Sequence, residues 1–447
     1  MTPTDPQPDH HRPGPPPGPP PGPPAPEAVP RSAAEPVPEA APEPEPLYGP
    51  DFAADPHGVY ARLRRHGASA PVMIAPGVEA LLVTDYQAAL DVLRDTDTFS
   101  KDPRNRQPPL PLDSPVLPIL GYRPTALFSD GDEHRRYRQV ITDGLALIEP
   151  HTLQAAVTTV AGDLISRFDG TGTADLIAQY ARRLPLFVFN TWFGVPAEHS
   201  DRLVAGMAGM MESAARAQAA YADLVAVVTA MVAERRERPR NDLTSWLLTH
   251  PADLDNDEVV RQITLVMSAG HEPTTNLIGN ALLRVLTDGR YAGSLFGGAM
   301  TAHQAIDEVL WHDPPLGILS AHYPRYDIEF HGRRLHTGQL VLVSYAAANA
   351  GTAPAADDGQ LRSGESAHLS WGAGPHSCPA RDPAMLIAIT AVEQLTSRLS
   401  DLELALPKEQ LIWRPGPFHR ALVNLPVRFS PVVRERPAAA VPADAVG

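Results

Sequence analysis

The stretch from Asp257 to about Thr287 constrains the fold more than any other part of the sequence. Its apolar residues fall on every side of a helix, and Asp255 or Asn256 just before it can cap the first turn. At a rise of about 1.5 Å per residue, this helix would span roughly 45 Å, the full width of a domain. A helix that is apolar all round is stable only when protein surrounds it. The stretch therefore predicts a large, mostly helical body built around one central helix.

The middle of this helix carries a polar patch, which reads Ala-Gly-His-Glu-Pro-Thr-Thr over 269–275. Pro273 has no N–H to give to the carbonyl of Ala269, and its ring crowds that carbonyl, at a typical cost of about 3 kcal/mol. One interpretation is a structural kink. The other is an opening in the backbone, where a free carbonyl, a carboxylate and hydroxyls face a cavity.

Shorter elements are predicted around the central helix. Helical spacing occurs at 55–66, 88–94, 133–145, 153–168, 174–193, 198–211, 221–236 and 385–399. Strand patterns occur at 72–74, 81–83, 327–330, 334–335 and 340–345. Helices outnumber strands, which are scattered singly or in pairs, so the predicted class is α+β and mainly α-helical.

The two ends of the chain differ from the part between them. Residues 1–46 are rich in Pro, Gly, Glu and Ala without any apolar period, so they are predicted to be disordered with extended polyproline character. This segment is either an inert tail or a ligand for a proline-binding module. A single globular domain is expected over 47–430, followed by a flexible tail over 431–447.

Charge and cysteine content exclude several classes of protein. The net charge of −15 disfavours nucleic-acid binding and polybasic attachment to membranes. A single cysteine excludes an intrachain disulfide and any multi-cysteine metal cluster. No apolar run approaches the roughly 18 residues of a spanning helix, and the N-terminus lacks the apolar region of a secretory signal. The sequence therefore predicts a cytoplasmic protein.

The only cysteine, Cys378, lies in the sequence Trp-Gly-Ala-Gly-Pro-His-Ser-Cys over 371–378. Gly372 and Gly374 allow a tight loop. Pro379 suits the first position of a following helix, which would place Cys378 at a helix N-terminus and favour its thiolate. If Asp382 caps that helix instead, the cysteine lies outside it and this argument is lost. A small buried apolar residue is the alternative for an isolated cysteine.

Taken together, these motifs resemble the cytochrome P450 family. The cysteine segment is similar to the family's haem loop, the segment His-Arg-Arg-Tyr-Arg over 134–138 to its haem-propionate helix, and 269–272 to its oxygen-activating helix. Further similarities lie at 183–185, 194–196, 313–315 and 420–427. The resemblance covers 47–430 and implies the P450 fold, a haem b cofactor and the following site residues. Cys378 would be the axial iron ligand. His134, Arg138, Ala269, Gly270, His322, Trp371, Gly372, Gly374 and His376 would contact haem, and Glu272 and Thr274 would be catalytic.

The chain departs from the family pattern at three functional positions. His322 stands where the family usually has an Arg, with Arg325 close by. The usual Glu-x-x-Arg ends in Trp311, as in an atypical bacterial branch that the chain resembles. Glu308 is therefore expected to find Arg362, or to be protonated or solvated, with Trp311 filling apolar space beside it.

The third departure lies in the central helix. Pro273 stands where the family commonly has a Thr, and Thr274 points about 100° away from that position on an ideal helix. Glu272 is then expected to matter more than Thr274 in delivering protons.

The activity implied by the resemblance is insertion of one oxygen atom of dioxygen into a small or medium apolar molecule. Electrons would come from a separate ferredoxin and its reductase, because the chain has no glycine motif for a flavin or nicotinamide. A monomer is expected. The alternatives are a haem-binding sensor without turnover and a peroxide-driven oxidase. Candidate residues are Arg135, Arg136 and Arg381 for ferredoxin docking, and Met207, Met210 and Met211 for the wall of the substrate pocket.

Overall fold

The computed structural model describes residues 43–196, 198–200, 202–203, 206, 214–292, 301–352 and 367–433, all within one compact unit, Pro42–Gly447. The three methionines at 207, 210 and 211, the alternative partner Arg362 and most of the two terminal segments lie outside these residues. In the described part of the chain, no helix is long and apolar enough to cross a membrane.

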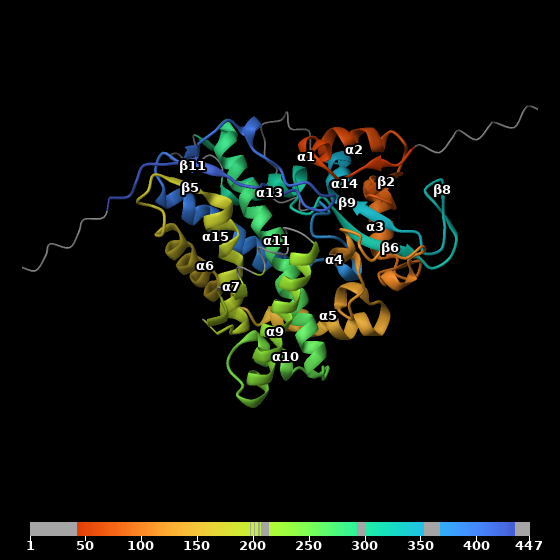
Figure 1. Cartoon of the computed structure of the whole chain (residues 1–447), viewed down its shortest axis with the longest axis horizontal. Coiled ribbons are helices and arrows are strands. Elements are labelled where there is room, and N and C mark those ends of the chain that lie inside the picture. The colour runs from red at the N-terminus through yellow and green to blue at the C-terminus, as the bar shows by residue number, and fades with distance from the viewer. Residues whose placement is uncertain are drawn as a thin grey trace, which may run out of the picture. The chain divides into compact units, whose positions relative to one another are not determined.

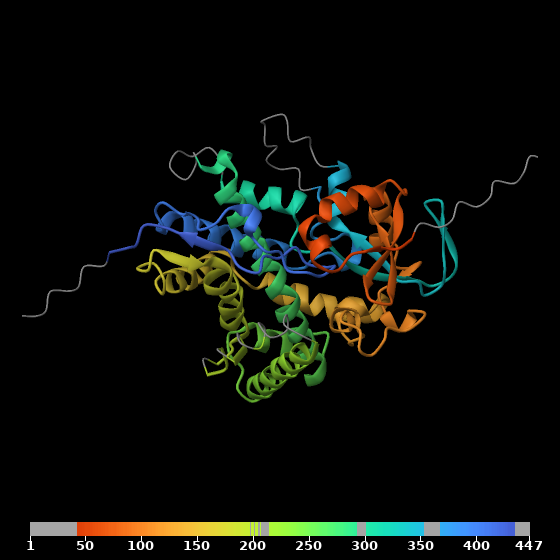
Figure 2. The same ribbon diagram turned by 45° about the horizontal axis from the view of Figure 1, so that its top comes forward.

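The central helix α11 spans Asn256–Thr287, close to its predicted bounds. Asp255 caps it in a reciprocal arrangement with Glu258, and Pro273 lies inside it without ending it. It packs against α7 (Arg183–Phe193), α9 (Ala214–Glu237), α13 (Ala302–His312) and α15 (Arg381–Arg398), so neighbours cover it on several sides. Figure 1 and Figure 2 both show α11 running through the middle of the helical part. The sequence-based prediction of a buried central helix is therefore confirmed.

The other helices are shorter. They are α1 (Pro50–Ala54), α2 (Pro56–Arg64), α3 (Tyr86–Arg94), α4 (Leu117–Leu120), α5 (Gly131–Ala146), α6 (Pro150–Ile165), α10 (Leu243–Leu248), α12 (Gly289–Ala292) and α14 (Tyr345–Thr352). α6 packs along α15, which follows the cysteine loop, while α5 contacts α10 and α11. His134 and Arg138, which the resemblance assigns to haem, thus lie on a helix that contacts α11.

One predicted helix, over 174–193, is wrong at its N-terminal end. Thr173–Asp175 forms strand β5, a short π-helical stretch covers Ile177–Ala181, and only then does α7 begin. β5 pairs antiparallel with β11, and the Asp175 carboxylate accepts hydrogen bonds from the N–H groups of Ile177 (3.0 Å) and Leu425 (2.9 Å). Pairing with a strand far along the sequence therefore overrides the local helical pattern.

Among the residues that the structure describes, the strands form one larger sheet and two small ones. They are β1 (Glu45–Pro46), β2 (Ser69–Ala75), β3 (Val78–Val83), β4 (Phe99–Ser100), β5, β6 (Ile318–Pro324), β7 (Ile328–Phe330), β8 (Arg333–Leu335), β9 (Val341–Ser344), β10 (Glu403–Leu404) and β11 (Pro426–Arg428). The larger sheet has the order β1-β2-β3-β9-β6-β4, so strands from the two halves of the chain lie side by side (Figure 1). The predicted α+β class is confirmed, with more strand pairing than the sequence indicated.

Strand β1 lies inside the segment predicted to be disordered. Glu45 and Pro46 pair with Val72 and Met73 of β2, and Arg62 forms an ion pair with Glu45. The folded body therefore includes the last residues of the 1–46 segment.

We expect removal of residues 1–42 to leave haem content and the thermal midpoint unchanged, because this segment has no apolar period with which to bury surface. Removal of 1–46 also deletes β1 and should cost about 1–2 kcal/mol of stability. Thermal unfolding of the two truncated proteins compares these effects. A large loss of folded haem protein on removing 1–42 would show that the tail packs on the body.

Candidate functional site

The cysteine loop, residues 371–378, lies just before α15, and backbone hydrogen bonds hold it in shape. Its backbone turns at Gly372 (φ 70°) and Gly374 (φ 68°), which favour glycine because they lie in the left-handed region. The N–H of Cys378 donates to the carbonyl of Trp371 at 2.8 Å, and the N–H of Gly372 donates to that of Leu369 at 2.7 Å. The two ends of the loop are thus held together, with the thiol on the segment that closes it.

Gly374 is also where the loop lies against α3. A Cβ atom at this position would stand 2.3 Å from the carbonyl oxygen of Leu93 and 3.0 Å from the Cα of Arg94. Both of these neighbours are backbone atoms of a helix, so they cannot move aside cheaply. The absence of a side chain at Gly374 therefore sets how closely the loop packs on α3.

Cys378 lies outside the helix that follows it, which corrects the prediction that Pro379 begins that helix. α15 starts at Arg381, with Asp382 in its first turn. Burial raises the pKa of the Cys378 thiol above its ordinary value, although the N–H of Ala380 and the positive charge of Arg138 act in the opposite direction. The free protein thus favours the thiol, and binding of a metal would release its proton.

A cluster of basic side chains faces the same loop. His134 of α5 and His376 lie with their ring centroids 3.9 Å apart, and the Nε2 atom of each is buried without a hydrogen-bond partner. Arg138, one turn along α5 from His134, donates to the carbonyl of Ser377. Burial lowers the pKa of His134 to about 4, helped by the charge of Arg138, and burial likewise lowers the pKa of His376. Both rings are therefore neutral, and neither Nε2 atom makes a hydrogen bond, with Asp130 Oδ1 4.0 Å from that of His376.

His322 of β6 lies near this cluster, close enough for its charge to affect the pKa of His376. Its side chain is buried, and its Nδ1 lies 2.6 Å from the carbonyl oxygen of Ser320. Burial lowers its pKa well below the ordinary value, so the ring carries no charge at neutral pH. Arg325, the nearby alternative, is instead paired with Asp130 at 2.7 Å.

Lys101, directly after β4, also belongs to the cluster, and the sequence reasoning missed it. Its side chain is buried, and its charge lowers the pKa values of His134, His322 and His376. The chain contains only two lysines among 37 basic residues. A lysine in so arginine-rich a sequence is the signal that could have drawn attention to this position.

The polar patch of α11 has a different arrangement from the one predicted. Glu272 is buried and forms an ion pair with Arg414, which lies in the segment between α15 and β11. Burial acts to raise the pKa of Glu272, but the charges of Arg414 and His419 and the hydrogen bond from Arg414 outweigh it, so its pKa is lowered. The carboxylate is therefore held ionised.

The neighbouring hydroxyl lies within the helix. Thr274 donates to the carbonyl of Gly270 at 2.7 Å, one turn back along α11, and its side chain is buried. Ala269 is exposed and Gly270 partly exposed, and a Cβ at Gly270 would lie 3.0 Å from the Phe189 ring of α7. The central turn of α11, residues 269–275, thus combines small residues with polar ones.

Glu308 is paired with two arginines that the sequence analysis did not name, while the predicted partner Arg362 lies outside the described residues. Glu308 pairs with Arg284, near the end of α11, and with Arg290 of α12 at 2.9 Å. Trp311 lies one turn further along α13. Its ring is partly exposed and meets His368 edge on, with centroids 5.6 Å apart. The two arginines satisfy Glu308, and the tryptophan covers the segment just before the cysteine loop.

A buried amide connects this region to the cysteine loop. Asn349 of α14 donates to the carbonyl of Leu310 and to the hydroxyl of Ser370, both at 3.1 Å, and its side-chain oxygen accepts from the N–H of Leu369 at 2.7 Å. Asn349 is fully buried. It therefore ties α13 to the segment that leads into the thiol, a contact that no motif in the sequence indicated.

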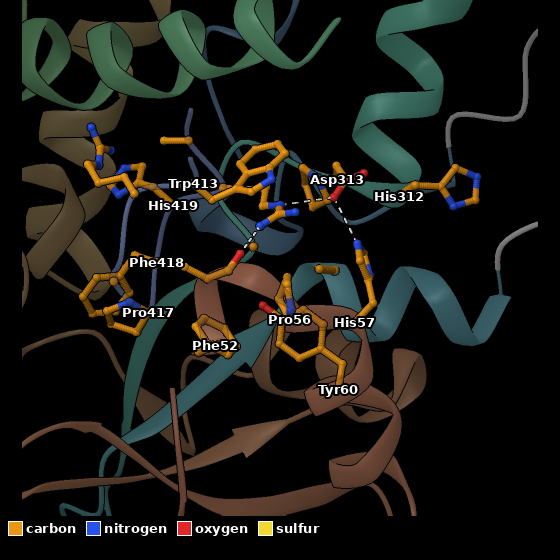
Figure 3. A pocket seen from close by; sticks show the side chains of 18 residues that line it. Phe52, Pro56, His57, Tyr60, His312, Asp313, Trp413, Pro417, Phe418 and His419 are labelled. Carbon is orange, nitrogen blue, oxygen red and sulfur yellow. Dashed lines mark hydrogen bonds and ion pairs between the residues drawn. The ribbon is translucent and has the colours of Figure 1, made fainter. Parts of the chain in front are cut away.

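A separate pocket of about 400 Å³ lies between α2, the end of α13 and the segment 413–421 (Figure 3). Asp313 is an acidic residue of its lining. Its Oδ1 lies 3.0 Å from His57 Nε2 and 3.4 Å from Arg420 Nε. None of the predicted site residues lines this pocket, but Arg414, the partner of Glu272, does. In the described ranges, no group of three or more His, Cys, Asp and Glu side chains could hold a metal ion. A metal at Cys378 would therefore need further ligands from a cofactor.

Comparisons with known proteins agree with this arrangement. No protein-family model matches the chain. The cytochrome P450 monooxygenase PikC of Streptomyces venezuelae is 30% identical over 391 residues, which cover 85% of this chain and 92% of PikC. The mycinamicin IV hydroxylase/epoxidase of Micromonospora griseorubida is 28% identical over 384 residues, covering 83% of this chain and 94% of that protein.

A solved structure shares the fold as well. CYP154C4 from Streptomyces sp. W2061 superposes with a TM-score of 0.78 at 26% identity, over 86% of this chain and 97% of that one. The identity to PikC extends over almost all of both chains, and the loop with the single cysteine, the basic cluster and the central helix occur in one fold. The chain belongs to the cytochrome P450 family of haem-containing monooxygenases.

Proposed function

We propose that this monooxygenase inserts one oxygen atom of dioxygen into a small or medium apolar molecule, using electrons from a separate ferredoxin and its reductase. The observation that carries the proposal is the basic cluster beside the cysteine loop. Two buried imidazole Nε2 atoms have no hydrogen-bond partner, and Asp130 Oδ1 comes no closer than 4.0 Å to that of His376. Together with a buried lysine they could bind an anion, and a thiol lies in the adjoining loop. The haem of this family offers both: two propionates and an iron that takes a thiolate.

The described residues therefore fit haem. Cys378 would hold the iron as thiolate, from a loop that the turns at Gly372 and Gly374 shape. His134 and His376 would donate to the propionates from Nε2, with Arg138 adding a positive charge. Trp371, His322, Ala269 and Gly270 would supply further contacts with the haem.

Bound haem supplies the redox chemistry of dioxygen activation, while the protein orients the substrate and manages protons. Glu272 is the proposed proton relay, because it is the carboxylate in the central turn of α11, and it would accept a proton before passing it on. Its ion pair with Arg414 ties it to a residue that lines the pocket of Figure 3. Rotation of the carboxylate away from Arg414 would connect that pocket to the turn that contains Gly270. Thr274 is the second candidate, but its hydroxyl proton already bonds to the helix backbone.

Fewer arginines are available for docking the ferredoxin than the sequence analysis proposed. Arg136 is engaged by Glu258 and by the carbonyls of Ala252 and Asp253, so it serves to hold α5 on the start of α11. Arg381 is exposed at the start of α15. Arg135 is also exposed, although it pairs with Asp132. These two arginines remain candidates for contact with an acidic partner.

Turnover in an atmosphere of oxygen-18 tests the proposal. With ferredoxin, reductase and a bound apolar substrate, we expect product that carries one labelled oxygen atom. Product formed from peroxide alone, without any from the reductase system, would favour a peroxide-driven enzyme. A protein that binds haem and substrate but forms no product with either electron source would instead be a sensor.

A further inference from the structure

Lys101 is placed beside His322 by the strand pairing. β4 runs antiparallel to β6, with Phe99 opposite Pro324 and Ser100 opposite Tyr323. The next step of this register brings Lys101 to His322, and the rings of Phe99 and His322 meet edge to face with centroids 6.4 Å apart. The lysine thus lies next to His322. The family usually has an Arg at this position, whereas the imidazole here is neutral.

The backbone at Lys101 is fixed by Asp130, the residue that precedes α5. The carboxylate of Asp130 accepts from the N–H of Lys101 at 3.1 Å and from the hydroxyl of Ser100 at 2.6 Å. It also pairs with Arg325 at 2.7 Å. Asp130 is therefore already satisfied by other groups, and its role is to anchor the end of β4 to the start of α5.

The ammonium group of Lys101 has no ion pair among the residues that the structure describes. Its side chain is only 4% exposed, and burial lowers its pKa to about 8, against the attraction of Asp130. Lysine is almost never buried without a partner, because an unpaired charge loses its hydration. A buried ammonium group without an ion pair in the protein alone indicates that a bound anion, from outside the chain, pairs with Lys101.

The charges in the cluster match those of a dicarboxylate. Burial lowers the pKa values of His134 and His322, so neither ring carries a charge at neutral pH. Arg325 is neutralised by Asp130. Arg138 and Lys101 then remain as two full positive charges, and the haem of the family carries two propionates.

We propose that Lys101 binds one haem propionate and supplies, from β4, the positive charge that the family pattern places at the position of His322 on β6. This inference rests on the proposed haem site. It assigns to Lys101 a cofactor-binding role within that site, and to Asp130 the role of a positioning residue.

Transfer of haem from the protein to an excess of a haem-scavenging apoprotein tests the proposal. We expect Lys101→Met to lose haem at least about tenfold faster than wild type, since a hydrogen bond to a charged group is lost. Lys101→Arg should stay close to wild type. Lys408→Met, which removes the other lysine at an exposed position, is the matched control and should leave the rate unchanged.

Two further measurements separate cofactor binding from a structural role. Without haem, Lys101→Met should unfold at the same or a higher temperature than wild type, because it removes a buried unpaired charge. The double variant Lys101→Met with His322→Arg should regain slow haem loss, because it returns a cation to the same place. It also keeps the proposal testable if the single variant folds poorly.

A wild-type rate of haem loss in Lys101→Met would overturn the proposal, as would a double variant that folds but does not regain haem. If wild-type protein itself takes up no haem, the haem site fails as a whole, and this result is distinct from either of the others.

Discussion

Gly374→Ala protein is expected to lose most of its haem. The new methyl group would stand 2.3 Å from the carbonyl oxygen of Leu93, and neither the loop nor α3 can give way without shifting the segment that leads to Cys378. The left-handed backbone at this position adds about 1–2 kcal/mol of strain. The haem-to-protein absorbance ratio after purification, together with thermal unfolding, measures the effect.

Gly372→Ala is the matched control for this variant. Its φ of 70° is close to the 68° of Gly374, but the nearest atoms to its new Cβ would be 3.6 Å away, an ordinary contact distance. It should therefore show the backbone strain of about 1–2 kcal/mol without the collision. Equal haem loss in the two variants would mean that the close approach of the loop to α3 is not what positions the thiol.

Glu272→Gln protein should form product about 100-fold more slowly, because the amide keeps the shape of the side chain but cannot relay protons. Electrons would still be consumed, so the yield of product per electron should fall as well. Glu272 pairs with Arg414 and is not among the proposed haem contacts, so haem content should stay at the wild-type level, and measuring it separates slow turnover from haem loss.

Thr274→Ala tests the competing assignment. Its hydroxyl donates to the carbonyl of Gly270, so its removal should cost less than about tenfold in product formation. Pro273→Thr, which restores the residue common in the family, should improve the yield of product per electron. If Glu272→Gln matches wild type while Thr274→Ala loses its product, the hydroxyl carries the relay and the assignment must be reversed.

The central helix and the cysteine loop could be predicted because their signals are local. A helix that is apolar on every side has to be buried, and the glycines before Cys378 allow the turn that the structure contains at φ 70° and 68°. The order of the motifs along the chain was enough to indicate the family, since each motif is a short segment that is readable by itself.

What could not be predicted depends on residues that are far apart in the sequence. Nothing local shows that Glu308 would meet Arg284, or that Glu272 would meet Arg414, because each pair joins segments that are brought together only by packing. Lys101 was missed for the same reason. The sequence around it resembles an exposed turn, and its burial follows from the pairing of β4 with β6.

The exact start of α15 could not be predicted from the sequence for a different reason. Both Pro379 and Asp382 are acceptable near a helix N-terminus, and the structure chooses the later start at Arg381. The N–H of Ala380 and the charge of Arg138, and not a helix N-terminus, then favour the thiolate of Cys378 against the effect of burial.

The carbon-monoxide difference spectrum of the reduced protein tests the central claim most directly, because the position of its band reports the ligand opposite carbon monoxide. Wild-type protein should show the red-shifted band of a thiolate-ligated haem, and Cys378→Ala protein should lack it while its thermal unfolding shows a folded chain. A red-shifted band that survives in Cys378→Ala, or that is absent from haem-loaded wild type, would contradict the assignment of Cys378 as the iron ligand.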